Sequence, residues 1–269
     1  MKNIIFFLLI FSVFFTGCKL KESKQQEPKL IVGIVIDQMR YDYLTRFSDR
    51  YSENGFKRLL KNGFSIENAY YNLIPTYTAV GHASIYTGTT PDNHGIISNN
   101  WYDKFLKKTI YCVDDDIYRT VGNNSDAGKK SPSRMYTTTV TDQLHLAQNM
   151  NGKTIGIAIK DRSAILPAGH TANAAYWVHG KQKGQWISSN FYMENLPNWV
   201  TDFNNSDKAN NYLKTPWNTL YDINTYTNSI IDNNLFEGKF KGETATSFPH
   251  DIPNLKVING NFDILKGIP

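Results

Sequence analysis

The sequence predicts an α/β protein with a mostly parallel central sheet. Residues 30–36 form an unbroken run of mostly β-branched side chains, and residues 153–159 form a second, largely apolar run. Runs of this kind are typical of central strands that are covered on both faces. Asp37 and Lys160 follow directly after the two runs. Because open parallel sheets bind ligands beyond the carboxyl ends of their strands, we expect both residues at the functional edge of the sheet.

The segment after Asp37 predicts one amphipathic helix over residues 42–60, which Gly63 would end. The apolar side chains expected on its buried side are Tyr43, Leu44, Phe47, Tyr51, Phe56, Leu59 and Leu60. Residues 70–74 predict a further strand, which leads into a turn at Pro75. Two strand ends would therefore bring Asp37 and the residues after this turn to the same edge of the sheet.

A short helix is expected to begin at Thr78 and to end at Gly88. Its apolar residues lie nearly all round it, which is typical of a buried helix. They are Ala79, Val80, Ala83, Ile85 and Tyr86. A hydroxyl at a helix N-terminus lies among unpaired N–H groups and the positive end of the dipole, which favours an alkoxide or a bound phosphate. On this stretch alone, however, a Thr that only caps the helix is the commoner case.

The later part of the chain predicts further helices and strands. Residues 138–149 predict a helix, and its inward side chains would be Val140, Leu144 and Ala147. Residues 172–179 and 185–188 predict two partner strands. A helix over residues 192–203 would be broken near Pro197.

Length and charge set broad limits on the function. A chain of 269 residues can bury a large core in one or two domains. Its formal net charge is +5, but more than half of this charge comes from residues 1–29. The folded part is therefore nearly neutral, and the composition does not indicate a nucleic-acid partner.

The first residues predict export. Residues 1–17 combine a basic start, a short apolar run and small residues, which is typical of a signal peptide and too short for a stable transmembrane helix. The Phe-Thr-Gly-Cys sequence that ends at Cys18 resembles a bacterial lipobox. This resemblance implies cleavage before Cys18 and a lipid anchor on it, so that the protein would be an exported bacterial lipoprotein held on a membrane, in the periplasm or at the cell surface. The alternative is an ordinary secretory signal with a chance Cys.

Residues 18–29 predict a polar tether without core-forming side chains. With Cys18 lipidated, Cys112 is the one remaining thiol, so an intrachain disulfide is excluded. We expect Cys112 to be a small packed residue in a strand rather than a catalytic one.

Four separated segments carry a resemblance to a known family. They are residues 30–40, 75–82, 95–104 and 159–170, and they occur in the order and near the spacing of that family. With them the chain resembles the phosphate-irrepressible alkaline phosphatases of the PafA type. These are zinc phosphomonoesterases of the alkaline phosphatase superfamily, related to type I phosphodiesterases and nucleotide pyrophosphatases, and they use a Thr nucleophile.

The resemblance runs from about residue 29 to the last residue but covers only the N-terminal half of such an enzyme. It implies a three-layer alkaline-phosphatase-like fold, truncated in this chain. Residues 30–269 would then be the N-terminal part of the domain, and residues from about 204 to 269, rich in Asn, Thr, Tyr and Gly, resemble an inserted accessory region.

The resemblance also assigns site residues. It implies that Thr78 is the nucleophile, that Asp37 and Thr78 are zinc ligands, and that the complete enzyme holds two zinc ions. Family position places a phosphate-binding residue at Asn99, with the adjacent Asn100 as the alternative.

Lys160 and Arg162 follow the run that ends at residue 159. Two cations that are two residues apart on an extended segment point the same way. The simpler interpretation is that Lys160 and Arg162 are a pair of basic side chains that only contact solvent. At a phosphate site they would instead be charge clamps, because Arg binds two oxygens at once and Lys acts as a point charge. In the resembling enzymes this pair favours phosphate monoesters over diesters.

The metal site of this chain is incomplete by the same resemblance. The family takes its other ligands from later segments, namely an Asp-x-x-x-His, an Asp-His pair and a distant His. No Asp-x-x-x-His occurs in the 269 residues. We therefore expect a fragment of a longer protein or an interrupted gene, and a chain that is inactive by itself.

Three functions remain open. The first is zinc-dependent hydrolysis of phosphate monoesters through a phosphothreonine at Thr78. The second is a phosphodiesterase or nucleotide pyrophosphatase of the same superfamily. The third is an inactive, membrane-anchored lipoprotein remnant. A sulfatase is disfavoured because no Cys- or Ser-x-Pro-x-Arg motif lies near Thr78.

Overall fold

The computed structural model describes residues 28–180, 183–261 and 263–264. The predicted signal peptide at residues 1–17, the predicted lipidation site Cys18 and most of the predicted tether at residues 18–29 lie outside the described residues. The chain divides into two compact units, Met1–Ile36 and Asp37–Pro269. We describe each unit by itself.

In the first unit, the predicted strand at residues 30–36 is not assigned to any strand. Leu30, Ile34 and Ile36 are all exposed. The prediction of a covered central strand is therefore wrong for the structure described. A β-branched run becomes a strand only where another segment supplies hydrogen-bonding partners, and such partners cannot be read from the run itself.

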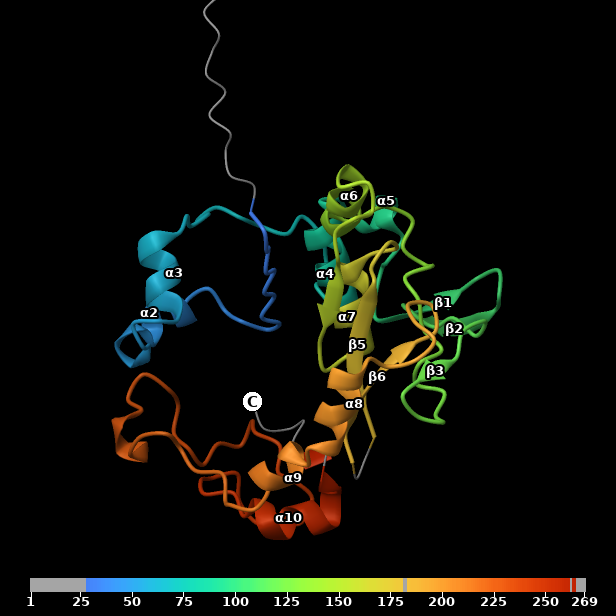
Figure 1. The fold of residues 1–269 in the computed structure, drawn as a ribbon. Coiled ribbons are helices and arrows are strands. Elements are labelled where there is room, and N and C mark those ends of the chain that lie inside the picture. The colour runs from blue at the N-terminus through green and yellow to red at the C-terminus, as the bar shows by residue number, and fades with distance from the viewer. Residues whose placement is uncertain (1–27, 181–182, 262, 265–269) are drawn as a thin grey trace, which may run out of the picture. The chain divides into compact units, whose positions relative to one another are not determined.

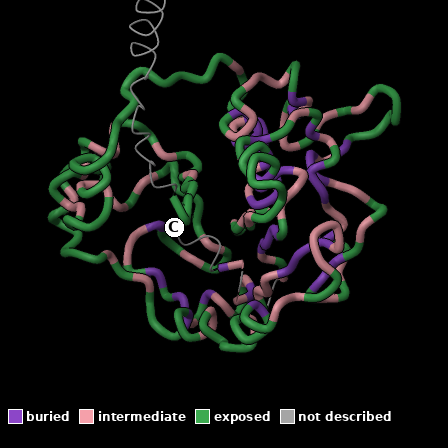
Figure 2. Tube along the Cα trace, turned by 45° about the horizontal axis from the view of Figure 1, so that its top comes forward, coloured by how far each residue is buried: buried purple, intermediate pink, exposed green. Residues whose placement is uncertain are grey.

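The second unit begins with short helices where one long helix was expected. The elements are α2 (Tyr43–Arg46), η1 (Ser48–Arg50) and α3 (Phe56–Asn62). None of their residues is buried, and Figure 2 shows how little burial there is before α4. The expected strand at residues 70–74 is also unassigned. Gly55 lies at the start of α3 and interrupts the expected helix, because glycine is a poor residue for a helix interior.

The next elements lead from a buried helix into a hairpin. They are α4 (Thr78–Thr87), α5 (Pro91–His94), β1 (Asn100–Asp103) and β2 (Lys108–Tyr111). As predicted, α4 begins at Thr78, and Gly88 ends it in the left-handed conformation at φ +67°. The strands β1 and β2 pair in antiparallel register, with Asn100 opposite Tyr111.

The second unit contains a four-stranded sheet in the order β3-β6-β5-β4, of which Figure 1 labels β3, β5 and β6. Its strands are β3 (Thr120–Val121), β4 (Ile155–Ile157), β5 (Ala174–His179) and β6 (Gln185–Ser189). The β4–β5 pair is parallel, and the β5–β6 and β3–β6 pairs are antiparallel. The α/β class is therefore confirmed, and the parallel part of the described sheet is β4–β5.

Helix α7 (Asp161–Ala168) connects β4 to β5 and packs on both strands and on α4. Its buried side chains join α4 and the sheet in one apolar core, which includes Ala79, Ala83, Ile165 and Ile187. Cys112 is fully buried in this core, as expected for a packed thiol, but it lies in a turn directly after β2 rather than in a strand. This core therefore fixes the beginnings of α4 and α7, where the candidate site residues lie.

Helix α6 (Val140–Ala147) forms where it was predicted, but its buried face was predicted wrongly. Val140 and Leu144 are exposed, whereas Asp142 and His145 are buried. Thr139 and Asp142 form a reciprocal capping box, and Thr171 also hydrogen-bonds Asp142. These bonds direct a polar face inward, because a buried carboxylate requires such partners.

The remaining elements are α8 (Asn198–Asn205), α9 (Lys208–Tyr212), η2 (Ile223–Thr225) and α10 (Ile252–Asn259). Pro197 directly precedes α8, so the helix predicted over residues 192–203 forms only after Pro197, and residues 192–197 are not helical. A second, small core joins Leu213, Ile252, Leu255 and Ile264. The accessory region from about residue 204 and the other domain boundaries stay predictions. Among the described residues, no helix has both the length and the hydropathy needed to cross a membrane.

Candidate active site

The structure brings Thr78 and Asp37 together. Thr78 is the first residue of α4, and its Oγ1 donates a hydrogen bond to Oδ2 of Asp37 at 3.0 Å. The other carboxylate oxygen of Asp37 accepts from the backbone N–H of Gln38 at 3.0 Å. Thr78 is half-buried and Asp37 is exposed. The hydroxyl therefore lies at the positive end of a helix with its proton directed at a carboxylate.

Asn99 is tied to the same helix end. Its Oδ1 accepts from the backbone N–H of Ala79 at 2.9 Å. Since an N–H can donate only to the amide oxygen, this bond fixes the amide orientation and leaves Nδ2 as a donor of two hydrogens. Asn100, the alternative, lies instead in the β1–β2 ladder and is exposed. Of the two, Asn99 is the residue in contact with the beginning of α4.

Lys160 and Arg162 lie at the start of α7 rather than on one extended segment. Lys160 is the N-cap residue with extended backbone, and Arg162 is already within the helix. The expectation that strand alternation makes the two side chains point the same way is therefore wrong. Lys160 is exposed, and among the described residues its side chain makes no hydrogen bond to Thr78, Asn99 or Arg162.

Arg162 is held by a tyrosine and an aspartate. Its Nη1 donates to the hydroxyl of Tyr111 at 2.9 Å, and that hydroxyl donates to Oδ1 of Asp161 at 2.5 Å. Burial is the largest single effect and lowers the pKa of Arg162, but the hydrogen bond to Tyr111 and the nearby Asp161 carboxylate together outweigh it, so the net direction of the pKa shift is upward. Burial and the nearby Asp161 carboxylate raise the pKa of Tyr111. Tyr111 is therefore a neutral phenol and Arg162 a cation.

One atom of Arg162 lacks a partner. Its Nε is buried and has no hydrogen-bond acceptor among the described residues. A buried donor without an acceptor costs about 1–3 kcal/mol. An anion beside this N–H would remove that cost.

The hairpin connects these contacts. The backbone N–H of Cys112 donates to the carbonyl of Asn99 at 3.0 Å, and Asn100 pairs with Tyr111 in the β1–β2 ladder. Asn99 therefore contacts α4, while Tyr111 on the partner strand contacts α7. The two helix beginnings are linked through one short hairpin.

The pair Asp37 and Thr78 fits part of a zinc site. Carboxylate and deprotonated hydroxyl oxygens are suitable donors, and two donors at about 2.0 Å from a tetrahedral zinc ion lie roughly 3.3 Å apart. The two oxygens are 3.0 Å apart in the structure. In the described part of the chain, no group of three His, Cys, Asp or Glu side chains could hold a metal ion. Further ligands would have to come from outside these residues.

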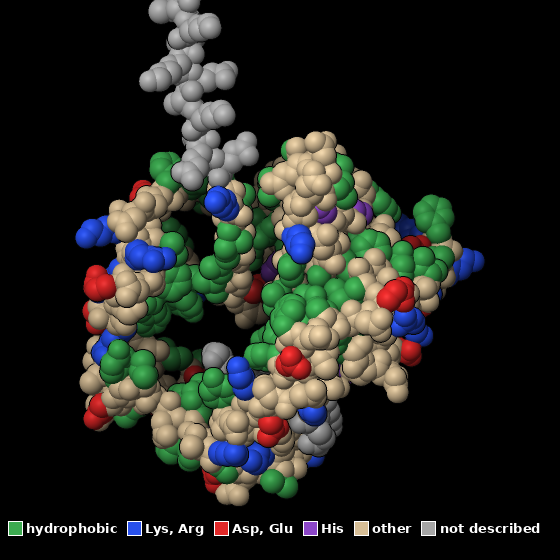
Figure 3. Space-filling model, in the orientation of Figure 1, with side chains coloured by type: hydrophobic (Ala, Val, Ile, Leu, Met, Phe, Trp, Pro, Cys, Tyr) green, Lys and Arg blue, Asp and Glu red, His purple; other side chains and the backbone are tan. Residues whose placement is uncertain are grey.

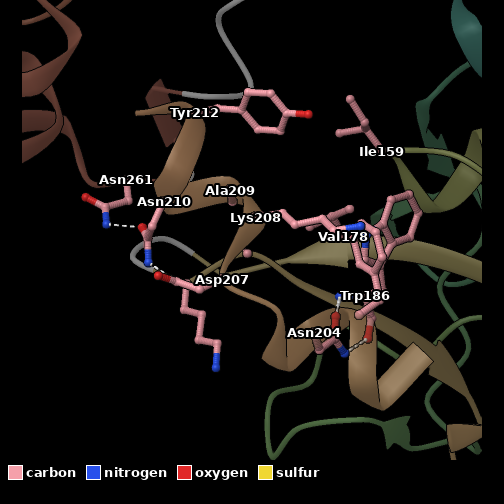
Figure 4. Close-up of a pocket in the computed structure, with 13 residues that line it drawn as sticks. Ile159, Val178, Trp186, Asn204, Asp207, Lys208, Ala209, Asn210, Tyr212 and Asn261 are labelled. Carbon is pink, nitrogen blue, oxygen red and sulfur yellow. Dashed lines mark hydrogen bonds between the residues drawn. The ribbon is translucent and has the colours of Figure 1, made fainter. Parts of the chain in front are cut away.

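A pocket of 410 Å³ lies elsewhere in the second unit (Figure 4). Trp186, Phe203 and Tyr212 contribute to its mostly apolar lining. None of the predicted site residues lines it. Exposed hydrophobic side chains gather on the face of the molecule shown in Figure 3. Ile157 of β4 and Trp199 of α8 are among the exposed apolar residues.

Sequence reasoning missed Tyr111 and Asp161. Tyr111 occupies the last position of a short strand, where a Tyr normally indicates packing, and Asp161 stands between the two noticed cations. The only available signal was that Asp161 begins a helix after a strand end. The contact between Tyr111 and Arg162 spans 51 positions of sequence and depends on the tertiary fold.

Several known proteins are similar to this chain. A family model for type I phosphodiesterase / nucleotide pyrophosphatase matches residues 31–258. A protein named calcium-transporting ATPase from Myroides odoratus is 50% identical over 256 residues, which are 95% of this chain and 46% of that protein. Alkaline phosphatase PhoV from Synechococcus elongatus is 50% identical over 242 residues, which are 90% of this chain and 44% of that protein.

Solved structures of alkaline phosphatase PafA are also similar. The wild-type enzyme matches with a TM-score of 0.83 and 45% identity, over 86% of this chain and 45% of that chain. A variant of PafA with a Thr, an Asn, a Lys and an Arg substituted matches with a TM-score of 0.80 and 42% identity, over 84% of this chain and 44% of that chain. These similarities confirm the expected resemblance and fold. The chain spans about half the length of the relatives it matches.

Proposed function

Because the chain belongs to the type I phosphodiesterase / nucleotide pyrophosphatase family, we propose that it carries the nucleophile and the phosphate-binding residues of a zinc-dependent phosphomonoesterase. The single observation that carries this proposal is the Thr78 hydroxyl, hydrogen-bonded to Asp37 at the beginning of a buried helix. The alkaline phosphatases among the relatives support phosphoester hydrolysis as the reaction class.

A further observation supports the choice of residues. The substituted PafA carries changes at a Thr, an Asn, a Lys and an Arg, in that order along its chain. The proposed set in this chain has the same residue types in the same order: Thr78, Asn99, Lys160 and Arg162.

In the proposed reaction, Oγ1 of Thr78 attacks the phosphorus of a phosphate monoester. The bond from phosphorus to the leaving alcohol oxygen breaks, and a covalent phosphothreonine forms at Thr78. Asp37 orients the hydroxyl by accepting its hydrogen bond at Oδ2, and the proton that Oγ1 loses on attack ends on the oxygen of the leaving alcohol. Water then hydrolyses the phosphothreonine and releases inorganic phosphate. Zinc bound by Asp37 and Thr78 would supply Lewis acidity that lowers the pKa of the Thr78 hydroxyl.

The phosphate-binding residues act on the non-bridging oxygens. Nδ2 of Asn99 is free to donate to one oxygen, and the N-terminal dipole of α4 favours the negative charge. Arg162 carries a donor without a partner, and the exposed Lys160 adds a second positive charge. Two cations suit the dianion of a monoester better than the single charge of a diester.

A phosphodiesterase or nucleotide pyrophosphatase is the second candidate, because the matching family model bears that description. The two candidates differ in the charge of the preferred substrate. Turnover of p-nitrophenyl phosphate and of bis(p-nitrophenyl) phosphate by the zinc-loaded protein, purified from cells that produce it, separates them. We expect faster monoester turnover, and its loss in Thr78→Ala. Faster diester turnover would instead support the second candidate.

We also propose that Cys18 carries a lipid anchor and that the 269 residues alone lack a full metal site. The Phe-Thr-Gly-Cys sequence motivates the first statement, and the absence of Asp-x-x-x-His the second. Membrane fractionation of the Cys18→Ser variant tests the anchor. If Cys18 carries the anchor, this variant should be released from membranes. Robust turnover by the isolated 269-residue chain would refute the second statement and leave the reaction class unaffected.

A further inference from the structure

Tyr111 lies between an acidic and a basic side chain. Its hydroxyl donates to Oδ1 of Asp161 and accepts from Nη1 of Arg162. A carboxylate can only accept, so the single hydroxyl hydrogen is committed to Asp161 and an oxygen lone pair faces Arg162. Within the described residues the guanidinium forms no direct ion pair with Asp161, although the two residues are neighbours in sequence.

This contact decides which donors of Arg162 remain available. Nη1 is engaged by Tyr111, and Nε is buried without an acceptor. The Nε and Nη2 groups form one edge of the guanidinium, and this edge can donate two parallel hydrogen bonds to two oxygens of one phosphate. The structure therefore holds Arg162 by one side and leaves a bidentate edge unused.

We propose that Tyr111 is a positioning residue, which orients Arg162 so that its Nε–Nη2 edge binds two oxygens of the substrate phosphate. Tyr111 also separates Asp161 from the guanidinium, so that the positive charge of Arg162 stays available to an anion. This inference rests on the proposed function, in which Arg162 binds phosphate. It adds a residue whose effect passes entirely through Arg162.

A merely structural Tyr111 would behave differently. Its ring packs against the main core, and Phe would keep that packing. Loss of the hydroxyl would then change stability without regard to the residue at position 162. A double-mutant cycle separates the two cases, because a residue that acts through Arg162 has no effect once Arg162 is replaced.

The experiment titrates the full chain with inorganic phosphate and compares wild type, Tyr111→Phe, Arg162→Lys and the double variant. The signal is the Nε–H resonance of Arg162 in ¹⁵N-labelled protein, identified by its loss in Arg162→Lys, and the dissociation constant is measured in parallel by calorimetry. Tyr118→Phe is the matched control. Tyr118 is half-buried, and among the described residues its hydroxyl makes no hydrogen bond.

We expect phosphate to shift the Nε–H resonance of the wild-type chain. Tyr111→Phe should weaken phosphate binding about 10-fold, as expected for a lost bond to a charged group, and should leave the Arg162→Lys background unchanged. The control should bind as wild type does. Wild-type affinity in Tyr111→Phe, with weakened binding in Arg162→Lys, would overturn the inference and leave the proposed function standing.

One other outcome would contradict the proposed function itself. If Arg162→Lys binds phosphate as tightly as wild type, Arg162 does not bind phosphate. If Tyr111→Phe does not fold, the wild-type resonance still decides the inference: a shift at Nε–H supports the unused edge, and a phosphate-bound chain without that shift contradicts it.

Discussion

The amide oxygen of Asn99 accepts a hydrogen bond from the backbone N–H of Ala79 at 2.9 Å. This one contact serves two purposes. It satisfies a free N–H in the first turn of α4, whose N-cap residue Tyr77 provides no side-chain bond. It also turns the amide nitrogen of Asn99 outward as a donor.

Two substitutions at Asn99 separate these purposes. Asn99→Asp keeps an acceptor for the helix but replaces the amide donor with a negative charge, so we expect near-wild-type stability and loss of phosphate binding. Asn99→Ala removes both, and its unfolding free energy should fall by about 1 kcal/mol. Urea denaturation and phosphate titration of both variants check this. Undiminished phosphate binding in Asn99→Asp would exclude Asn99 from the phosphate site.

Stability should depend on pH through Asp142 and His170. Nδ1 of His170 lies 3.3 Å from Oδ2 of Asp142, and Nε2 lies 2.8 Å from the carbonyl of Met135. Both ring nitrogens face acceptors, which favours the doubly protonated ring. The hydrogen bond to Asp142 raises the pKa of His170. Burial alone would raise the pKa of Asp142, but hydrogen bonds led by that from His170 hold it well below its usual range.

The pKa shifts of His170 and Asp142 affect the stability of the fold in different pH ranges. The contribution of His170 is complete below its unfolded pKa of about 6.5 and is lost as pH rises through the raised value. The contribution of Asp142 is complete above its unfolded pKa of about 3.9 and is lost as pH falls through the lowered value. Urea denaturation between pH 5 and 9 should show falling stability for wild type, and a flatter profile for His170→Gln. Identical profiles would refute the charged pair.

The same substitution should have opposite effects at two glycines. Gly169 has φ +80°, and an added methyl would meet Thr139 and Asp142, so Gly169→Ala should destabilise the chain by more than 1 kcal/mol, roughly. Gly81 lies inside α4 with open space around it, so Gly81→Ala should add up to about 1 kcal/mol. Thermal unfolding of both variants gives the signs. Equal effects would mean that the packing around Gly169 is not as described.

Cys112 should be unreactive in the folded chain. It is fully buried in the main core, and burial raises the pKa of its thiol to about 12. Thiolate is the reactive form, so iodoacetamide should modify Cys112 only after unfolding. The Cys18→Ser background removes the other thiol. Rapid modification of the native chain would show that the core around Cys112 opens readily.

Local patterns predicted part of this fold correctly. The start of α4 at Thr78 and its end at Gly88 depend on residues near in sequence, and both agree with the structure. Of the helix predicted over residues 192–203, only the part after Pro197 forms, as α8. The strand at residues 30–36 failed because pairing depends on a distant segment. The prediction of the inward face of α6 was wrong because the hydrogen bonds of Asp142 outweigh the burial of Leu144.

The candidate site shows the same division. The predicted proximity of Asp37 and Thr78 agrees with their hydrogen bond, although neither of the two strands that were expected to bring them together is assigned. The partner of Arg162 was not anticipated, since Tyr111 lies on a different element and carries no distinguishing pattern. Extended geometry was assumed through Lys160 and Arg162, but α7 begins between them.

The most direct test of the central claim is to trap the covalent intermediate. The zinc-loaded protein from its producing cells is mixed with a ³²P-labelled phosphate monoester, quenched in acid, digested and analysed by mass spectrometry. The account predicts labelled phosphate on the peptide that contains Thr78, and no label in Thr78→Ala. Monoester turnover with the label on another residue, or turnover retained in Thr78→Ala, would contradict it.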